Sequence, residues 1–391
     1  MSCPVIIFVQ GSSSLKAGLS NNEEPLCKIP FVVGRPMIGG ININEVYLLK
    51  PLLIGDEVIS IKSLLELTHP IKEGIIYYMD ETAILWDYVI SKKLKMDNSD
   101  LKSRKLLITD EAFSTYENKN KIAEILFEKI GIGFLGIESK AKMSIYGHGE
   151  DTGVIVDSRN NNTQIIPILS DYIIHDKIKL LDIGGKEITK YLGRLIIKKG
   201  YPFHLATDLD KVNEIKEKYC FVSGNIDSDR KLEHETTYYN SNIKLPDGRN
   251  IIISKEKFEA PEILFSPYLI QNESQGIHEL LFNSLELCNT DIRKKLYSNI
   301  ILSGGNTLFP GLPSRLEFEL RKLYKEKYMK SENKKHINTG IAIKDTPNRQ
   351  DLSFIGAANL SEIYKNENYE KYWISKKDWE ETGEKIFYHK F

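Results

Sequence analysis

The 391-residue sequence predicts an α/β fold built from two similar halves. Two apolar runs, at 5–9 and 153–157, each end in a polar turn and continue into a second strand, at 15–19 and 163–167. Apolar runs bounded by turn residues are typical of buried strands that enter hairpins. Two such units about 150 residues apart indicate a duplicated domain with a cleft between its halves.

Helical patterns follow both units, at 118–129 and 188–198, with apolar residues three and four positions apart. Strands that alternate with helices favour an α/β fold, in which ligands bind at the C-terminal ends of the strands. A further apolar strand ends in Ser303-Gly304-Gly305-Asn306, before a helix. Because a glycine pair lets the backbone approach a phosphate or purine closely, this turn predicts a nucleotide site.

Composition narrows the class of protein. With 41% hydrophobic and 27% charged residues the chain is ordinary for a soluble globular protein, and a net charge of -1 gives no general attraction to nucleic acid or membrane. The four cysteines have no metal-binding spacing and predict free thiols in a reducing compartment. The sequence contains neither a signal-peptide pattern nor an apolar run near the ~20 residues of a membrane helix, so we expect a soluble intracellular protein without membrane insertion or direct nucleic-acid binding.

Several segments identify a family. They follow one another in the family's order along nearly the whole chain, and they are Val33-Gly34-Arg35-Pro36, Leu85-Trp86-Asp87-Tyr88, Asp182-Ile183-Gly184-Gly185, Glu259-Ala260-Pro261-Glu262 and Leu312-Pro313-Ser314-Arg315-Leu316. This pattern resembles the actin superfamily, and 86–88, 259–262 and 312–316 resemble its actin-related protein 2 branch.

The resemblance implies an actin-like two-lobed fold, with duplicated ribonuclease H-like domains and four subdomains around a nucleotide cleft. The expected boundaries are 1–30, 71–147 and 348–391 for subdomain 1, 31–70 for subdomain 2, 148–183 and 275–347 for subdomain 3, and 184–274 for subdomain 4. The loops 37–47 and 331–338 are the segments expected to be mobile.

The resemblance also implies a set of nucleotide contacts, with ATP or ADP as the ligand. The two strand-turn-strand units match the family's phosphate-binding hairpins, Lys16 matches a phosphate-contacting lysine, and Lys216 and Glu217 match residues that face the ribose and base. The implied contact residues are Gly11, Ser12, Lys16, Asp157, Ser158, Gly185, Lys216, Glu217, Gly304, Gly305 and Asn306.

The sequence departs from the family where the metal and the attacking water are held. Val9 and Gln10 stand around an aspartate of the first hairpin. In the second hairpin Asn160 replaces an acid, and Arg159 and Asn161 replace glycines. Lys140 and Gln164 replace the glutamine and histidine that position water.

These departures predict that the chain is not an enzyme. Mg²⁺ needs oxygen ligands in octahedral geometry, so we expect weak Mg²⁺ binding or none, with no metal residues and no catalytic residues. Each loss of an aligned group typically costs ~10²-fold or more in rate, which predicts negligible ATP hydrolysis. Arg is also a poor substitute wherever a hairpin needs a positive φ.

Two interpretations of the new cations stay open. Lys140 and Arg159 either substitute for Mg²⁺ and hold ADP or ATP as a static ligand, or they only fill and rigidify an empty cleft.

The function implied is that of a non-catalytic structural subunit of an actin-related protein 2/3-type complex, which nucleates branched actin filaments. Its partners would be an actin-related protein 3-like subunit, β-propeller and helical scaffold subunits, and actin itself, in the cytoplasm and cytoskeleton. One alternative is a subunit of a nuclear or spindle-associated assembly that does not act on actin. The other is a nucleotide-binding, polymerising ATPase.

Overall fold

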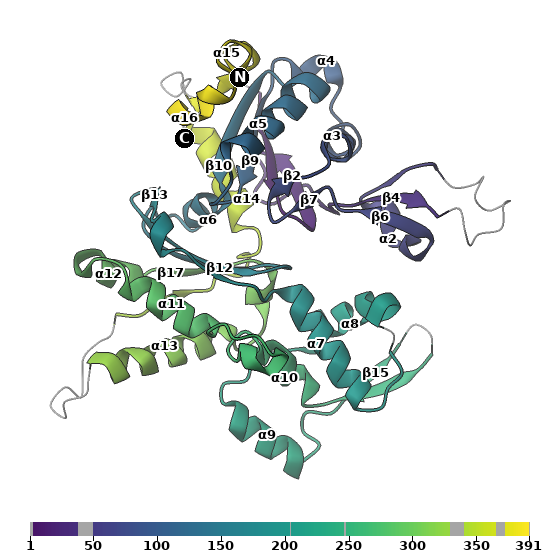
Figure 1. Cartoon of the computed structure of the whole chain (residues 1–391), viewed down its shortest axis with the longest axis vertical. Coiled ribbons are helices and arrows are strands. Elements are labelled where there is room, and N and C mark those ends of the chain that lie inside the picture. The colour runs from purple at the N-terminus through teal and green to yellow at the C-terminus, as the bar shows by residue number, and fades with distance from the viewer. Residues whose placement is uncertain are drawn as a thin grey trace. The chain divides into compact units, whose positions relative to one another are not determined.

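The computed structural model describes residues 3–37, 50–203, 205–245, 248–328, 340–364 and 372–390. The chain divides into two compact units, each with its own main sheet (Figure 1). Unit 1 comprises Met1–Glu150 and Asp351–Phe391, and unit 2 comprises Asp151–Gln350. Of the two loops expected to be mobile, 331–338 and all but the first residue of 37–47 lie outside the described residues.

The main sheet of unit 1 has six strands in the order β19-β10-β9-β1-β2-β3. Its central strand β1 (Ile6–Gln10) is buried throughout, runs antiparallel to β2 (Ser14–Leu19) and parallel to β9 (Lys105–Asp110). The outer strands are β10 (Phe134–Ser139), β3 (Cys27–Pro30) and β19 (Ile374–Ser375).

Helices cover both faces of this sheet because alternate residues of β1 point to opposite sides. Ile6 and Phe8 join one apolar cluster with Trp86 of α3 (Met79–Tyr88) and with helices α5 (Tyr116–Glu124) and η3 (Ile125–Ile130). Ile7 joins another cluster with Phe354 of α14 (Leu352–Ile363) and with α6 (Lys140–Gly147). An apolar run without alternation is what such a doubly covered strand requires.

Smaller elements complete unit 1. A second sheet consists of β4 (Val33–Pro36), β5 (Leu53–Ile54) and β6 (Leu65–Thr68), and β7 (Ile71–Lys72) pairs with β8 (Ile75–Ile76). The further helices are α2 (Asp56–Ile59), η1 (Lys62–Leu64), α4 (Asn98–Leu101), α5 (Tyr116–Glu124), α15 (Lys376–Thr382), η8 (Gly383–Lys385) and α16 (Ile386–Lys390), with the π-helical η2 (Val89–Lys93) and η3 (Ile125–Ile130).

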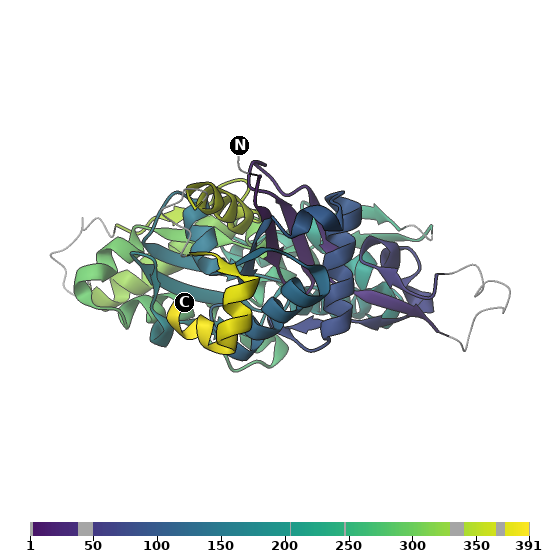
Figure 2. The ribbon, with the colours of Figure 1, turned by 90° about the horizontal axis from the view of Figure 1, so that it is seen from above.

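The C-terminal helices of unit 1, yellow in Figure 2, pack against α5 and η3 through aromatic contacts. The ring of Tyr388 contacts that of Tyr116 at a tilt, with centroids 4.2 Å apart, and the indole of Trp379 donates a 3.0 Å hydrogen bond to Asn120. The end of the chain is therefore part of the core around α5.

The main sheet of unit 2 has the order β13-β12-β11-β17-β18, with β14 paired to β12. Its strands are β11 (Gly153–Ser158), β12 (Thr163–Leu169), β13 (Tyr172–Ile173), β14 (Lys179–Leu181), β17 (Ile300–Ser303) and β18 (Ile343–Lys344). A separate hairpin joins β15 (Ser241–Lys244) and β16 (Asn250–Ile253).

The helices of unit 2 bury apolar residues in one large cluster with the sheet, except α9 (Ile226–Glu235), which has no buried residue. They are α7 (Gly185–Lys198), α8 (Leu205–Tyr219), α9 (Ile226–Glu235), α10 (Glu256–Glu262), α11 (Ile277–Glu286), α12 (Thr290–Tyr297) and α13 (Leu312–Tyr328), with the short 3₁₀ turns η4 (His175–Lys177), η5 (Pro267–Ile270) and η6 (Gly305–Leu308).

The two main sheets repeat one pairing pattern. In unit 1, β1 pairs antiparallel with the strand that follows it and parallel with β9, and in unit 2, β11 pairs antiparallel with β12 and parallel with β17. This confirms both predicted hairpins and the duplication. The helix predicted over 188–198 lies within α7, and the one over 118–129 is divided into α5 and the π-helical η3. The boundaries of the four subdomains remain a prediction.

Candidate functional site

The hairpin between β11 and β12 lies beside the turn that follows β17. Parallel pairing sets Asp157 opposite Ser303, so the chain leaves both strands at the same edge of the sheet. Gly304 has φ of 87°, and a Cβ atom there would lie 2.2 Å from the carbonyl oxygen of Ser158. Only glycine allows this approach, which brings the predicted contacts Ser158, Gly304 and the exposed Gly305 together.

Asn306 fastens the turn to the hairpin. Its Nδ2 donates to Ser158 Oγ at 3.2 Å and to the carbonyl oxygen of Arg159. Ser158 Oγ also lies 2.8 Å from Thr163 Oγ1, which donates to the carbonyl oxygen of Ile183. Since these groups are buried and mutually bonded, the hairpin is held in one conformation.

The N-terminus of α7 binds the same hairpin through its backbone. The N–H groups of Gly185 and Lys186 donate to the carbonyl oxygens of Arg159 and Asn160, both at 2.8 Å. A Cβ atom on Gly185 would lie 2.8 Å from Asn306 Oδ1, 3.2 Å from Lys216 Nζ and 3.5 Å from Asn160 Oδ1. One lysine and two amide side chains, together called the cradle, therefore pack directly against Gly185 and leave no room for a side chain there.

Lys216 enters this cradle from α8. Its side chain is buried, and Nζ donates to the carbonyl oxygen of Gly185 at 3.2 Å, to Thr189 Oγ1 at 3.0 Å and to Asn213 Oδ1 at 2.7 Å. Burial lowers the pKa of this ammonium from its usual value. The neighbouring Glu217 is exposed and accepts a 2.8 Å hydrogen bond from Asn213, so these two predicted contacts lie side by side on one helix.

Arg159 binds the acid of its own hairpin. Its Nε donates to Asp157 Oδ2 at 2.5 Å, and the Asp157 side chain is only 1% exposed while that of Arg159 is 16% exposed. Neither Arg159 nor Asn161 is among the described residues with positive φ. The replacement of the family's glycines is therefore accommodated without left-handed backbone.

This geometry does not fit a divalent cation. Mg²⁺ requires several oxygen ligands at 2.0–2.1 Å, yet a guanidinium nitrogen already lies against the Asp157 carboxylate, and Asn160 offers only a neutral amide. In the part of the chain that the structure describes, no group of three or more His, Cys, Asp or Glu side chains could hold a metal ion.

Gln164 lies next to the acid. The antiparallel register of β11 and β12 pairs Asp157 with Gln164, and directly opposed residues point to the same face of a sheet. Gln164 is 6% exposed, within the sheet. A neutral amide at this position can donate or accept a hydrogen bond but cannot act as a general base at neutral pH.

The hairpin of unit 1 is built like that of unit 2. The N–H of Gly11 closes the turn on the carbonyl oxygen of Ser14 at 3.0 Å, and Ser12 Oγ accepts from the N–H of Gly74 at 3.3 Å. Gln10 is buried, and its N–H donates to Thr109 Oγ1 at 3.1 Å. Its amide carries no charge, and Val9 and Gln10 stand around the position that the resemblance assigns to an aspartate.

Lys16 and Lys140 are the two lysines of unit 1 that the sequence matched to positions of the family's site. Lys16 forms an ion pair with Asp351 at 2.6 Å, and the two side chains are 13% and 18% exposed. Lys140 is half-buried at the first position of α6, where its carbonyl oxygen accepts from Ser144 Oγ. Thus the ammonium matched to a phosphate contact has a carboxylate partner in its own unit.

Sequence reasoning missed the residues that position the predicted ones. Asn213 lies one helical turn before Lys216, so its spacing could have indicated the contact. Asp351 lies far from Lys16 in the sequence, and no local pattern connects them. In unit 2, the predicted nucleotide contacts lie close together around the β11–β12 hairpin and the cradle. In unit 1, the predicted contacts lie on the β1–β2 hairpin and in the strand that follows its turn.

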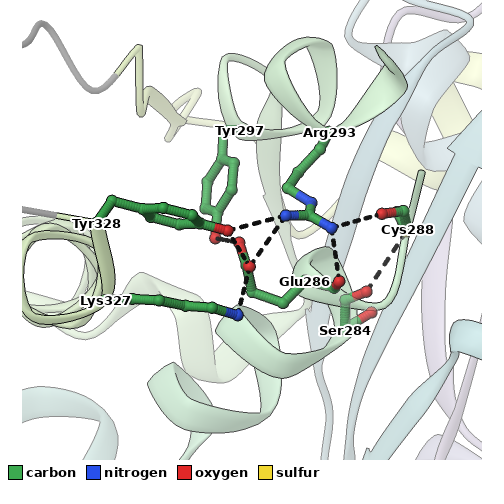
Figure 3. Close-up of polar contacts among 7 residues, drawn as sticks. All are labelled: Ser284, Glu286, Cys288, Arg293, Tyr297, Lys327 and Tyr328. Carbon is green, nitrogen blue, oxygen red and sulfur yellow. Dashed lines mark hydrogen bonds and ion pairs between the residues drawn. The ribbon is translucent and has the colours of Figure 1, made fainter. Parts of the chain in front are cut away.

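A second polar cluster, around Glu286, was also missed. Figure 3 shows four side chains that meet at its carboxylate, which is 7% exposed. Arg293 Nη1 donates at 3.0 Å, Lys327 Nζ at 2.7 Å and the hydroxyl of Tyr297 at 2.9 Å, and the hydroxyl of Tyr328 donates as well. The cluster joins the end of α11 to α12 and α13, which indicates a structural role.

Comparisons with known proteins agree with the resemblance identified from the sequence. A sequence model of the Actin family matches residues 2–391. The chain is 38% identical over 388 residues to actin-related protein 2 of Drosophila melanogaster, covering 98% of this chain and 96% of that protein. It is 36% identical over 378 residues to actin-related protein 2 of Schizosaccharomyces pombe, covering 97% and 96%. It is 34% identical over 385 residues to actin-related protein 2 of Acanthamoeba castellanii, covering 98% of each.

Proposed function

The chain belongs to the actin family, and from that premise we propose that it is the counterpart of actin-related protein 2, a structural subunit of a multi-subunit complex. The single observation that carries this proposal is the similarity to actin-related protein 2 over 98% of the chain. The match also covers 96% of that relative, so it is not confined to one segment of either chain.

The proposed partners are an actin-related protein 3-like subunit, scaffold subunits of β-propeller and helical type, and actin. The complex would nucleate branched actin filaments in the cytoplasm, with the cytoskeleton. Among the described helices none is both long and apolar enough to span a bilayer. The two alternatives set out from the sequence, a nuclear or spindle-associated subunit and a polymerising ATPase, gain no support from the relatives, which are named actin-related protein 2.

The site is proposed to contact ATP or ADP without hydrolysing it appreciably. The cradle of Lys216, Asn306 and Asn160 beside Gly185 suits the polar edges of a nucleotide, because the lysine donates hydrogen bonds and the two amides both donate and accept them. Hydrolysis needs a positioned water and neutralised phosphate charge. Gln10 and Gln164 supply amides where the family positions its metal ligand and its water.

The test of the proposed complex is affinity purification of the tagged chain from its own cells, followed by mass spectrometry. Recovery of an actin-related protein 3-like chain with a β-propeller subunit in equal amounts is the expected result. Recovery of chromatin or spindle proteins in place of these subunits would show that the chain belongs to a different assembly.

Hydrolysis is tested separately on the purified chain. Phosphate release from ATP with Mg²⁺ should not exceed that of a protein-free blank, with purified actin as the positive control. Release at a rate comparable to that of actin would mean that the chain is an active ATPase.

A further inference from the structure

The Asp157–Arg159 pair determines which ions can approach the second hairpin. A divalent cation would have to share the Asp157 carboxylate with a guanidinium nitrogen 2.5 Å from Oδ2. Two cations at one buried carboxylate repel each other strongly, because the protein interior screens charge less than water does. Asn160 supplies no second negative charge to offset this repulsion.

We propose that Arg159 replaces the divalent cation at this hairpin, so that the site binds a nucleoside di- or triphosphate without metal. This inference rests on the nucleotide contact in the proposed function. Guanidinium is the cation best suited to the role, because it is always charged and its N–H donors recognise phosphate oxygens in pairs.

Hydrogen bonds hold Arg159 both at its side chain and at its backbone. Nε is bound to the buried Asp157 carboxylate, and the carbonyl oxygen of Arg159 accepts from the N–H of Gly185 at 2.8 Å and from Asn306 Nδ2. With both ends bound, the side chain loses little conformational freedom when a ligand arrives. At 16% exposure the Arg159 side chain is still accessible to a ligand from solvent.

Charge balance supports the same assignment. A pair of carboxylates with one divalent cation has no net charge, and neither has Asp157 with Arg159. The Arg at 159 and the Asn at 160 together make up for the missing divalent cation, because the first adds a positive charge and the second removes a negative charge. A phosphate group at this hairpin would therefore encounter the same net charge as at a metal-bound hairpin with two carboxylates. The positive charge would come from the Arg159 guanidinium instead of a metal ion.

The experiment is titration calorimetry of the purified chain with ATP, once in Mg²⁺ and once in EDTA. Wild-type binding should be no tighter in Mg²⁺ than in EDTA, since no metal takes part and Mg²⁺ would compete with Arg159 for the phosphate oxygens. Arg159→Gly should weaken binding in EDTA by about tenfold or more, and Arg159→Lys, which retains the charge, should lose less. The double variant R159G/N160D should bind ATP more tightly in Mg²⁺ than in EDTA.

Each contrary result is decisive. The inference is overturned if Mg²⁺ tightens wild-type binding by about tenfold, if ATP binds in neither buffer, or if Arg159→Gly has no effect in EDTA. Thermal unfolding of each variant shows that it is folded. Co-purification of the wild-type chain with its partners reports on the complex separately, so an intact complex with Mg²⁺-dependent binding would reject this inference alone.

Discussion

The ammonium of Lys16 lies 2.6 Å from Oδ1 of Asp351, the residue that precedes α14. Both residues belong to unit 1, and both side chains are largely buried. The lysine that the sequence matches to a phosphate contact therefore has an internal counter-ion. A phosphate that approaches Lys16 competes with this carboxylate.

Asp351→Asn tests the competition. Loss of the carboxylate should lower the free energy of unfolding by about 1 kcal/mol, because a partly buried ion pair is lost. It should also raise the affinity for ATP by about threefold to tenfold, since the charge of Lys16 is no longer neutralised. Calorimetry and chemical denaturation measure the two effects. Asp80→Asn, which removes the exposed pair with Lys129, serves as control and should change neither. Weaker ATP binding in Asp351→Asn would mean that Asp351 positions Lys16.

Gly304 and Gly305 offer a matched comparison. Gly304→Ala places a Cβ 2.2 Å from the carbonyl oxygen of Ser158 on a backbone with φ of 87°, so it should lower the free energy of unfolding by at least about 2 kcal/mol. Gly305→Ala meets no atom within 4 Å and should be tolerated. Urea denaturation compares the two variants, and equal stability would show that the turn relaxes more easily than its contacts indicate.

From the environment of Glu286 we expect the folded protein to lose stability in acid. Burial would raise the pKa of Glu286, but hydrogen bonds from Lys327, Tyr328 and Tyr297 and the charge of Arg293 together lower it from 4.5. A carboxyl group with a lowered folded-state pKa binds protons more readily when unfolded, so its stabilisation is present above the unfolded pKa and is lost as pH falls through the folded pKa.

Glu286→Gln should therefore lower the free energy of unfolding at neutral pH by about 2 kcal/mol and flatten its acid dependence. Denaturation series at several pH values measure both. Glu317→Gln, which removes the half-exposed pair with Arg321, is the control and should leave the acid dependence unchanged. An unchanged acid dependence in Glu286→Gln would assign the loss to other carboxylates.

The contribution of Asp110 to the free energy of unfolding should depend on pH in the opposite direction. Burial raises the pKa of Asp110 from 3.8 to about 6. Its folded state binds protons more readily than its unfolded state, so the contribution of Asp110 is fully present below 3.8 and is lost as pH rises through about 6. Asp110→Asn should raise the free energy of unfolding at pH 8 by about 1–2 kcal/mol, because no charge is then buried. Denaturation at pH 8 and pH 5 measures this, and a gain of equal size at both values would contradict the titration.

Local patterns predicted the strands and turns of the site because these depend on near neighbours. The apolar runs that became β1 and β11 are central strands covered on both faces, and Gly304 after β17 and Gly185 at the start of α7 mark true close approaches. The chemistry at Arg159 was left open between two interpretations. Its contact with Asp157 depends on a side-chain rotamer, and sequence spacing alone does not determine rotamers.

Contacts between distant segments could not be predicted. The partner of Lys16 comes from the start of α14, and that of Glu286 comes partly from α13. Such pairs arise only when the sheets bring the segments together. The division of the predicted 118–129 helix into α5 and the π-helical η3 was missed as well, since both forms have similar apolar spacing.

The hydrogen bonds that Arg159 accepts have a consequence for how this site diverged. Gly185 and Asn306 bind its carbonyl oxygen, which every amino acid possesses, while the side chain alone meets Asp157. A mutation at this position can therefore alter the ionic chemistry of the pocket and leave its scaffold intact. A change of side chain at this position, from a metal-binding hairpin to one that carries a guanidinium, would thus keep the backbone hydrogen bonds that hold the hairpin in place.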